Sequence, residues 1–321
     1  MNRSLITITS CNRLQEVKKF IWDYLKFVNS NNEFHFVLSL DGNNQTYIVF
    51  CETYDIPLIY SEEREGVGLS KNRVLTQFPD YDYYFFIEDD VELINESIFN
   101  HCIGIYNKTG YPHLCGNYDH AIENTKAYGE YTLDKSYSGG GYFSFFTNEG
   151  LKNVGGWNTL FAKYKRFGHT EHTYRFYHSK LQPSPFIFSR ELNDMIMIHD
   201  VVSVTKHSGL QMDNMQLVID ERKLIDQKTT YFPLSTLSPF HFNDKQLGHN
   251  KKVKRFLEKN PQKYPLTTGK PRKKAMGEYY ALMINNKSNS HLKNLFLAIK
   301  SMYFAPMNNE LKHKIKYYFK K

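Results

Sequence analysis

Cysteines and long apolar runs are scarce in this sequence, and each shortage excludes a class of protein. The 321 residues include four cysteines and no C-x-x-C pair, which excludes a disulfide scaffold and a zinc ribbon. No segment approaches 18 consecutive apolar residues, so no membrane-spanning helix is expected. No signal sequence precedes the first strand-like segment, residues 5–9. We therefore expect a cytoplasmic protein.

The formal net charge of +8 combines two parts of opposite sign. Residues 251–321 carry 18 Lys and Arg side chains against three acids, and residues 1–250 carry 23 against 30. An acidic body with a basic tail lacks the even basic coat of a nucleic-acid-binding protein. We expect no nucleic-acid partner, a folded domain over residues 1–250 that ends near 245–250, and a basic helical extension over residues 251–321.

The basic tail contains two segments with apolar residues at helical spacing, residues 290–304 and 309–321. Basic amphipathic helices bind anionic membrane surfaces. This pattern predicts peripheral contact with the inner face of a membrane. An ordinary helical appendage and an oligomer contact are the alternatives, and the oligomeric state stays open.

The first hundred residues alternate between strand and helix patterns. Apolar runs predict strands over residues 5–9, 34–40, 57–60 and 83–87, and amphipathic spacing or link length predicts helices over 14–29, 45–54 and 69–78. Such repeats with short links indicate an α/β fold with a mostly parallel sheet flanked by helices. Ligands bind at the carboxyl ends of the strands in these sheets. We therefore expect the polar residues that end the strands to converge, namely Asn12, Arg13, Asp41, Gly42, Glu88, Asp89 and Asp90.

The second half of the chain is less regular. A glycine-rich stretch precedes an aromatic strand predicted over residues 142–146, and a helix is predicted over 169–180. A mostly apolar, strand-like run covers residues 195–204. Residues 208–235 are expected to form a lid that excludes water from a donor molecule.

Glu88, Asp89 and Asp90 follow an apolar strand directly. Three adjacent acids repel one another unless a cation or hydrogen-bond donors neutralise them. Mg²⁺ and Mn²⁺ prefer such oxygens and commonly take one or two carboxylates together with substrate phosphates. The alternative is a solvated acidic turn. Their place at a strand end favours the metal site.

Four segments resemble the nucleotide-sugar-binding half of GT-A fold glycosyltransferases, especially family 2 enzymes. Residues 6–13 resemble the first strand and its nucleotide-contacting turn, and residues 38–42 resemble the strand whose Asp holds the uracil ring. Residues 66–73 resemble the G-x-x-x-x-R/K-N helix start. Residues 85–93 resemble the D-x-D element in an E-D-D form. The resemblance implies a GT-A (Rossmann-like) domain with its nucleotide-sugar half over residues 1–110 and its acceptor half over 111–250.

The resemblance also implies a UDP-sugar donor and a bound Mn²⁺ or Mg²⁺. Asp90 is expected to be the direct metal ligand, with Glu88 and Asp89 facing ribose or metal-bound water. A divalent cation stabilises the charge that develops on the departing diphosphate. Many relatives place a metal-binding histidine where His207 stands, with His199 as a nearby competitor.

Nucleotide-sugar contacts are implied for Thr9, Arg13, Asp41, Lys71 and Asn72. Asp41 is expected to accept a hydrogen bond from the uracil N3. Arg13 and Lys71 are expected to offset phosphate charge. The alternative for both cations is a solvated position on the surface of a helix.

The acceptor side is implied by residues 155–158 and 168–175, which resemble the G-G-W/F-D…G-x-E-D…R pattern of inverting family members. In those enzymes a carboxylate deprotonates the acceptor hydroxyl. The usual acidic pair is replaced here by Glu171 and His172, and Glu171 is the first choice of base. Sliding the alignment by two residues puts His169 or His172 in that place, and histidine also serves as a base. The alternative for Glu171 is an ion pair with the arginine four residues later.

Gly156 and Trp157 are expected to line an acceptor or sugar pocket, with a core position as the alternative for Trp157. Together these features predict a metal-dependent, inverting glycosyltransferase that moves a sugar from a UDP-sugar to a hydroxyl of a surface glycan or glycolipid, such as a polysaccharide or lipopolysaccharide. A sugar-1-phosphate nucleotidyltransferase is a second candidate, but residues 9–13 lack the glycines of its phosphate loop. A membrane- or nucleic-acid-binding module that acts through the tail is the non-enzymatic alternative.

Overall fold

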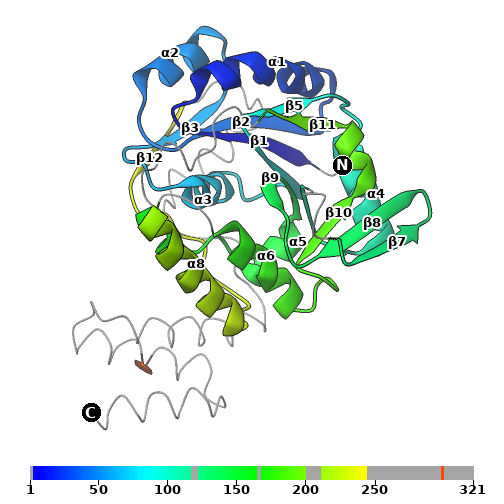
Figure 1. Cartoon of the computed structure of the whole chain (residues 1–321). Coiled ribbons are helices and arrows are strands. Elements are labelled where there is room, and N and C mark those ends of the chain that lie inside the picture. The colour runs from blue at the N-terminus through cyan, green and yellow to red at the C-terminus, as the bar shows by residue number, and fades with distance from the viewer. Residues whose placement is uncertain (1–2, 117–121, 165–167, 200–210, 244–297, 300–321) are drawn as a thin grey trace.

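A seven-stranded sheet runs through the centre of the protein, which we describe from a computed structural model (Figure 1). The structure describes residues 3–116, 122–164, 168–199, 211–243 and 298–299. The strands lie in the order β12–β3–β2–β1–β4–β9–β6. Their bounds are β1 (Ser4–Ser10), β2 (Phe34–Leu40), β3 (Leu58–Ser61), β4 (Tyr83–Glu88), β6 (His113–Gly116), β9 (Gly140–Thr147) and β12 (Phe240–Asn243).

The first four strands are parallel, and their register aligns their carboxyl ends. β1 pairs with β2 on one side and with β4 on the other, so Ser10 lies beside Leu40 and Thr9 beside Glu88. β2 pairs in the same sense with β3. The turns after these strands therefore open at one edge of the sheet, where ligands bind in sheets of this kind.

Helices cover both faces of this parallel half (Figure 1). They are α1 (Leu14–Ser30), α2 (Gln45–Thr53), α3 (Val67–Gln77) and α4 (Ile98–Thr109). α1, α2 and α4 pack on the face that carries Ile6 and Ile8, whereas α3 packs on the face that carries Leu5. Alternate residues of β1 thus point into two separate cores, as the two-residue period of a strand requires.

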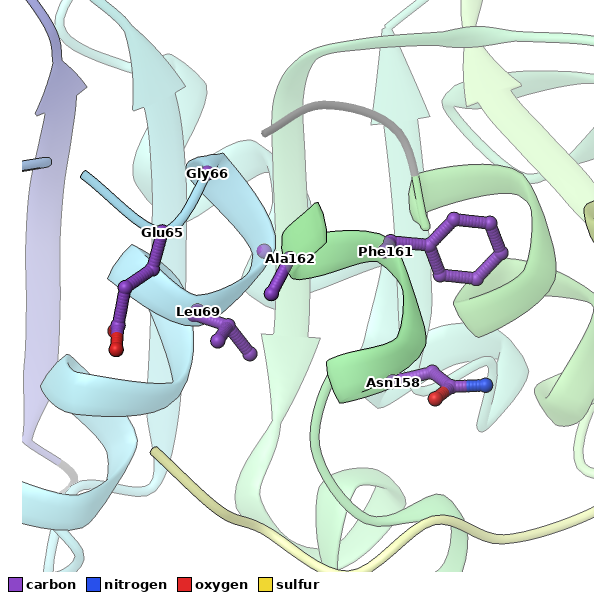
Figure 2. A pocket seen from close by; sticks show the side chains of 7 residues that line it. Glu65, Gly66, Leu69, Asn158, Phe161 and Ala162 are labelled. Atoms are coloured by element: carbon purple, nitrogen blue, oxygen red, sulfur yellow. The ribbon is translucent and has the colours of Figure 1, made fainter. Parts of the chain in front are cut away.

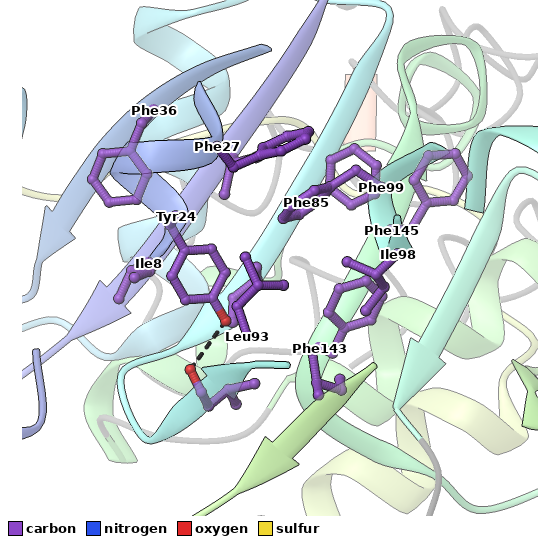
Figure 3. Packing of buried hydrophobic residues seen from close by; sticks show 14 of the residues in the cluster. Ile8, Tyr24, Phe27, Phe36, Phe85, Leu93, Ile98, Phe99, Phe143 and Phe145 are labelled. Carbon is purple, nitrogen blue, oxygen red and sulfur yellow. Dashed lines mark hydrogen bonds between the residues drawn. The ribbon is translucent and has the colours of Figure 1, made fainter. Parts of the chain in front are cut away.

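Aromatic rings make up a substantial part of the larger core (Figure 3). Phe85 of β4 packs edge-on against Phe99 of α4, which stacks on Phe27 of α1 with 4.8 Å between ring centroids. Tyr24 of α1 is fully buried, and its hydroxyl donates a hydrogen bond to the Val91 carbonyl. This bond holds β5 (Val91–Leu93), the strand that follows the acidic turn, against α1.

The rest of the described chain completes the sheet in the antiparallel sense. β9 pairs with β4, β6 pairs with β9, and β12 pairs with β3. Two small sheets, β10–β8–β7 and β11–β5, lie beside it. The remaining elements are β7 (Asn124–Tyr128), β8 (Tyr131–Ser136), α5 (Asn148–Val154), η1 (Thr159–Tyr164), α6 (His169–His178), β10 (Phe186–Ser189), η2 (Arg190–Asp194), β11 (Ile196–Ile198) and α8 (Gln211–Asp226).

The structure confirms the strand and helix pattern predicted for the first hundred residues. Every predicted strand and helix is present there, with ends within two residues of the predicted ones. The aromatic strand lies inside β9, and the predicted helix over 169–180 is α6. The predicted run over 195–204 contains β11, and its residues from 200 onward lie outside the described residues. The predicted lid over 208–235 contains α8, and its closing motion stays a prediction.

The tail over residues 251–321 lies outside the described residues apart from Ala298 and Ile299, and the domain boundary stays a prediction. Within the described ranges, no helix combines the length and the apolar character needed to cross a bilayer.

Candidate functional site

The carboxyl edge of the sheet brings Thr9 next to the acidic turn. Thr9 is buried, and its hydroxyl donates a hydrogen bond to the Ile87 carbonyl, 3.3 Å away. This bond joins β1 to β4 just before both strands end. The Thr9 side chain is therefore used inside the sheet, and its predicted nucleotide contact stays a prediction.

Arg13 links the turn after β1 to two of the acids. Its guanidinium hydrogen-bonds to the Asp89 carboxylate and lies 3.0 Å from Asp90 Oδ2. Burial lowers the pKa of Arg13, but hydrogen bonds to Asp89 and Asp90 and the charges of both acids outweigh it, so the pKa is raised. Burial raises the pKa of Asp89, and the hydrogen bonds from Arg13 and Ser10 oppose that shift. The predicted convergence of these turns is confirmed at Arg13, Asp89 and Asp90.

Ser10 and Tyr47 support this cluster, and the sequence analysis missed both. The Ser10 hydroxyl donates to Asp89 Oδ2 at 2.5 Å and lies 2.7 Å from the Tyr47 hydroxyl. The Arg13 backbone N–H also donates to the Tyr47 hydroxyl, at 2.7 Å. Ser10 ends β1, and this position at a strand end was the one feature of the sequence that could have indicated a role for Ser10 in the site. Tyr47 comes from α2, and no local pattern relates that position to the acidic turn.

The acidic turn has the chemistry of a divalent-cation site. Asp90 is 4% exposed, and its Oδ1 is a buried oxygen with no hydrogen-bond partner. Such an oxygen is costly unless something binds it. Glu88 and Asp89 supply further hard oxygens beside it. No group of three or more His, Cys, Asp or Glu side chains in the described residues is arranged to enclose a metal. A Mg²⁺ or Mn²⁺ ion held by one or two carboxylates plus substrate phosphates fits this donor set.

The two histidines considered as further metal ligands differ in their placement. His199 Nε2 lies 2.5 Å from Glu92 Oε2, and the His199 backbone N–H donates to the Asp90 carbonyl at 2.8 Å. His199 therefore lies near the acidic turn but its ring pairs with another acid. His207 lies outside the described residues, so its metal-binding role stays a prediction.

Lys71 lies in the core of the domain beneath the acidic turn. It is 2% exposed, and its Nζ lies 5.7 Å from the Phe86 ring centre and 5.3 Å from that of Trp157. Burial lowers its pKa to about 8, and the Glu88 charge opposes that shift. Burial likewise raises the pKa of Glu88, with Lys71 as the opposing charge. Lys71 is thus a buried counter-charge for Glu88, and the alternative of a solvated helix face is wrong.

Asp41 holds the loop that leads into α3. Its two carboxylate oxygens accept hydrogen bonds from the backbone N–H groups of Glu65 and Gly66, both at 2.8 Å. Gly66 has a φ of 99°, a conformation that favours glycine. Arg73 lies 3.6 Å from the same carboxylate. These contacts give Asp41 a structural task in the loop, and its predicted bond to uracil stays a prediction.

Asn72, Gly156 and Trp157 form a buried junction. The Asn72 side chain accepts from the Trp157 N–H at 2.7 Å and donates to the Trp157 carbonyl and to the Ser235 carbonyl. A Cβ on Gly156 would lie 2.5 Å from Asn72 Oδ1, so only glycine fits there. Trp157 is 2% exposed and packs edge-on against Phe86. The structure places Trp157 in the core, so no face of the ring is open to a sugar, and Asn72 serves as a tether.

A small cavity lies between the start of α3 and η1 (Figure 2). Its volume is about 10 Å³, which is the space of roughly one water molecule. The residues that line it are Glu65, Gly66, Gly68, Leu69, Asn158, Phe161 and Ala162. It is far too small for a nucleotide, so it is not the donor site.

Glu171 and His172 of α6 both point into the protein interior. Glu171 is 1% exposed, and its Oε1 lies 2.9 Å from Nε of the fully buried Arg175. Burial raises the pKa of Glu171, and Arg175 opposes that shift. His172 Nε2 lies 3.0 Å from the Gly155 carbonyl, and its ring stacks on Trp157 at 4.1 Å. The alternative of an ion pair for Glu171 is confirmed, although the pair is buried rather than on the surface.

His169 begins α6 and is the partly exposed member of the three candidate bases. Its ring packs against Gly141, where an added Cβ would lie 3.0 Å from His169 Cγ. It hydrogen-bonds to the Gly139 backbone, and its Nε2 has no hydrogen-bond partner. Burial and the charge of Lys71 lower the pKa of His169 well below its ordinary value.

No protein-family model matches the sequence, and neither does any curated protein sequence. Among solved structures, S. aureus TarS superposes with a TM-score of 0.50 at 12% identity, over 96% of this chain and 54% of TarS. The chain thus spans about half the length of TarS. Mannosyltransferase PcManGT from Pyrobaculum calidifontis, solved with GDP-Man and Mn²⁺, gives 0.46 at 12% identity over 97% and 82% of the two chains. GalNAc-T7, solved with UDP, GalNAc and Mn²⁺, gives 0.42 at 9% identity over 58% and 41%. The likeness to TarS, together with the mainly parallel sheet and its flanking helices, establishes that this chain has a GT-A fold.

Proposed function

We propose that this protein is a metal-dependent glycosyltransferase that transfers a sugar from a UDP-sugar to a hydroxyl of a glycan or glycolipid. One observation carries the proposal. At the carboxyl edge of a GT-A sheet, Arg13 and two buried aspartates form a cluster in which Asp90 Oδ1 has no partner. That edge is where such sheets bind nucleotides, and the free oxygen suits a hard cation.

Asp90 would hold the cation, with Asp89 beside it. When bound, a divalent cation supplies Lewis-acid stabilisation of the charge on a departing nucleoside diphosphate. Arg13 is 24% exposed and lies beside the same carboxylates, so it is suited to a phosphate contact. Lys71 adds positive charge behind Glu88 and keeps that carboxylate from being an isolated buried charge.

His169 is the best placed of the three candidate bases. β9 runs antiparallel to β4 with Phe143 beside Ile87, so the start of β9, which includes Gly141, lies at the carboxyl end of β4. Because His169 packs against Gly141, its ring lies at the same edge of the sheet as the acidic turn. Its Nε2 is buried without a hydrogen-bond partner, and its lowered pKa suits a neutral proton acceptor. Glu171 and His172, by contrast, are 1% and 0% exposed, and Glu171 is ion-paired with Arg175.

The proposed reaction inverts the anomeric carbon. The acceptor oxygen attacks that carbon while its proton moves to His169 Nε2. The bond from the anomeric carbon to the β-phosphate oxygen breaks, and its electron pair leaves with the nucleoside diphosphate. The imidazolium then returns its proton to solvent. A membrane-associated acceptor accords with the basic tail over residues 251–321.

A donor screen tests the proposal. UDP or GDP release is measured from UDP-glucose, UDP-galactose, UDP-GlcNAc and GDP-mannose, with Mn²⁺ and with EDTA. We expect release from a UDP-sugar with Mn²⁺ that is lost in EDTA and in Asp90→Ala. The matched control Asp23→Ala removes an exposed acid on α1 and should leave release unchanged. Full activity of Asp90→Ala would contradict the metal site. Formation of a nucleotide sugar from UTP and a sugar 1-phosphate would instead identify a nucleotidyltransferase.

A further inference from the structure

Arg13 contacts the two carboxylates that would hold a metal ion. Its guanidinium contacts the Asp89 carboxylate and lies 3.0 Å from Asp90 Oδ2. Among the described residues, no other Lys, Arg or His nitrogen lies within 4.0 Å of either carboxylate. A single guanidinium is therefore the one positive charge beside these two buried acids in the described part of the chain.

The backbone at Arg13 is held by a hydrogen bond, whereas its side chain is partly exposed. The preceding residue, Asn12, has a φ of 58°, and the Arg13 N–H donates to the Tyr47 hydroxyl. Tyr47 in turn lies against Ser10, which donates to Asp89. These contacts fix the turn and Asp89. The guanidinium is 24% exposed, so it borders solvent on one side.

The two oxygens of Asp90 have opposite surroundings. Oδ2 lies beside the guanidinium, and Oδ1 has no hydrogen-bond partner. A divalent cation that binds Oδ1 meets a second positive charge on the same carboxylate. Like charges at this separation in a buried site repel strongly. The carboxylates therefore bind either cation well, but not both together.

We propose that Arg13 and the divalent cation are alternative occupants of the Asp89–Asp90 pair, and that the displaced guanidinium binds the diphosphate of the donor. The second half of this inference rests on the proposed function, and the first half does not. It follows that the metal binds weakly on its own, because it must displace Arg13, and more tightly with a nucleoside diphosphate, because the diphosphate binds the displaced guanidinium. By linkage, the diphosphate binds more tightly with the metal by the same factor.

The test measures Mn²⁺ binding to the full-length chain by the EPR signal of free Mn²⁺, first without nucleotide and then with UDP. Removing the competing charge in Arg13→Gln should tighten Mn²⁺ binding without nucleotide by about 5- to 150-fold, the range typical of coupled sites. The gain that UDP adds should shrink in this variant. The matched control Arg190→Gln breaks the Arg190–Asp134 pair at 2.8 Å and should leave Mn²⁺ affinity unchanged.

Arg13→Lys serves as a second variant that keeps the charge, and its Mn²⁺ affinity should stay within a few-fold of the wild type. Unchanged or weaker Mn²⁺ binding by folded Arg13→Gln would overturn the inference, as would the absence of Mn²⁺ binding in every form. Because Mn²⁺ alone is the probe, the result is independent of sugar transfer. If the Arg13→Gln affinity rises and no UDP-sugar is consumed, the exchange stands and the proposed function fails.

Discussion

The buried pair of Glu171 and Arg175 allows a sharp test of whether Glu171 has a structural or a catalytic task. Both side chains are at most 1% exposed, and Arg175 also donates to the Val154 carbonyl at 2.6 Å. Removing one partner of a buried ion pair leaves the other charge uncompensated and costs about 3–5 kcal/mol. For a domain of this size, each kcal/mol lowers the melting temperature by about 2–4 °C. We therefore expect Glu171→Leu to lower the melting temperature by roughly 6–20 °C.

The assay is thermal and urea unfolding followed by circular dichroism. The double variant Glu171→Leu with Arg175→Met should recover much of the loss, because a well-packed apolar pair replaces the charges. Arg222 and Asp226 on α8 provide a control with the same spacing, since this pair is largely exposed, at 3.1 Å. Asp226→Asn should cost no more than about 0.5 kcal/mol. If Glu171→Leu melts within 2 °C of the wild type while sugar transfer is lost, the structural reading is refuted and Glu171 returns as the base.

Three further predictions concern the base, the pH dependence and the tail. His169→Gln should lower the rate of sugar transfer by roughly 10²- to 10⁴-fold and leave UDP binding unchanged. The control His178→Gln, at the other end of α6, should have no effect on the rate. A near-normal turnover of His169→Gln would exclude His169 as the base. Burial raises the pKa of Glu221 to about 7, so its contribution to stability is present below pH 4.5 and is lost as the pH rises through 7. In urea unfolding between pH 4 and 8, the free energy of unfolding of Glu221→Gln should depend less on pH than that of the wild type. An identical pH dependence would show that Glu221 does not contribute to it. Removing residues 251–321 should abolish binding to vesicles that contain anionic phosphatidylglycerol, and equal binding with and without the tail would contradict a membrane role for it.

The N-terminal half of the fold was predictable because its information is local. Each strand is a short apolar run, and α1 shows its buried stripe in the sequence through Val17, Ile21 and Tyr24. The parallel arrangement then brings Arg13 and Asp89 together without any knowledge of side-chain contacts.

The candidate base could not be predicted in the same way, because the buried face of α6 carries charged and polar residues and no apolar stripe marks it in the sequence. Glu171, His172 and Arg175 all lie inside, and the groups that accept them come from elsewhere in the chain: Val154 and Gly155 before the helix and Trp157 beside it. The sequence alone therefore favours Glu171 as the base. Only the three-dimensional partners show that His169 is the residue left at the edge of the sheet.

The Asn72 junction also sets a condition on how this chain folds during synthesis. The amide of Asn72 bonds to the Ser235 carbonyl, 163 residues later, and β12 pairs with β3 from a similar distance. At 5–20 residues per second, a ribosome needs about 8–33 s to make that stretch. For that time the β3 edge of the sheet is uncovered and Asn72 lacks its bond to Ser235, so the nucleotide half cannot complete its fold when it first emerges. A chaperone that binds exposed strand edges should therefore associate with nascent chains that contain residues 1–110 and should leave once residue 243 has emerged.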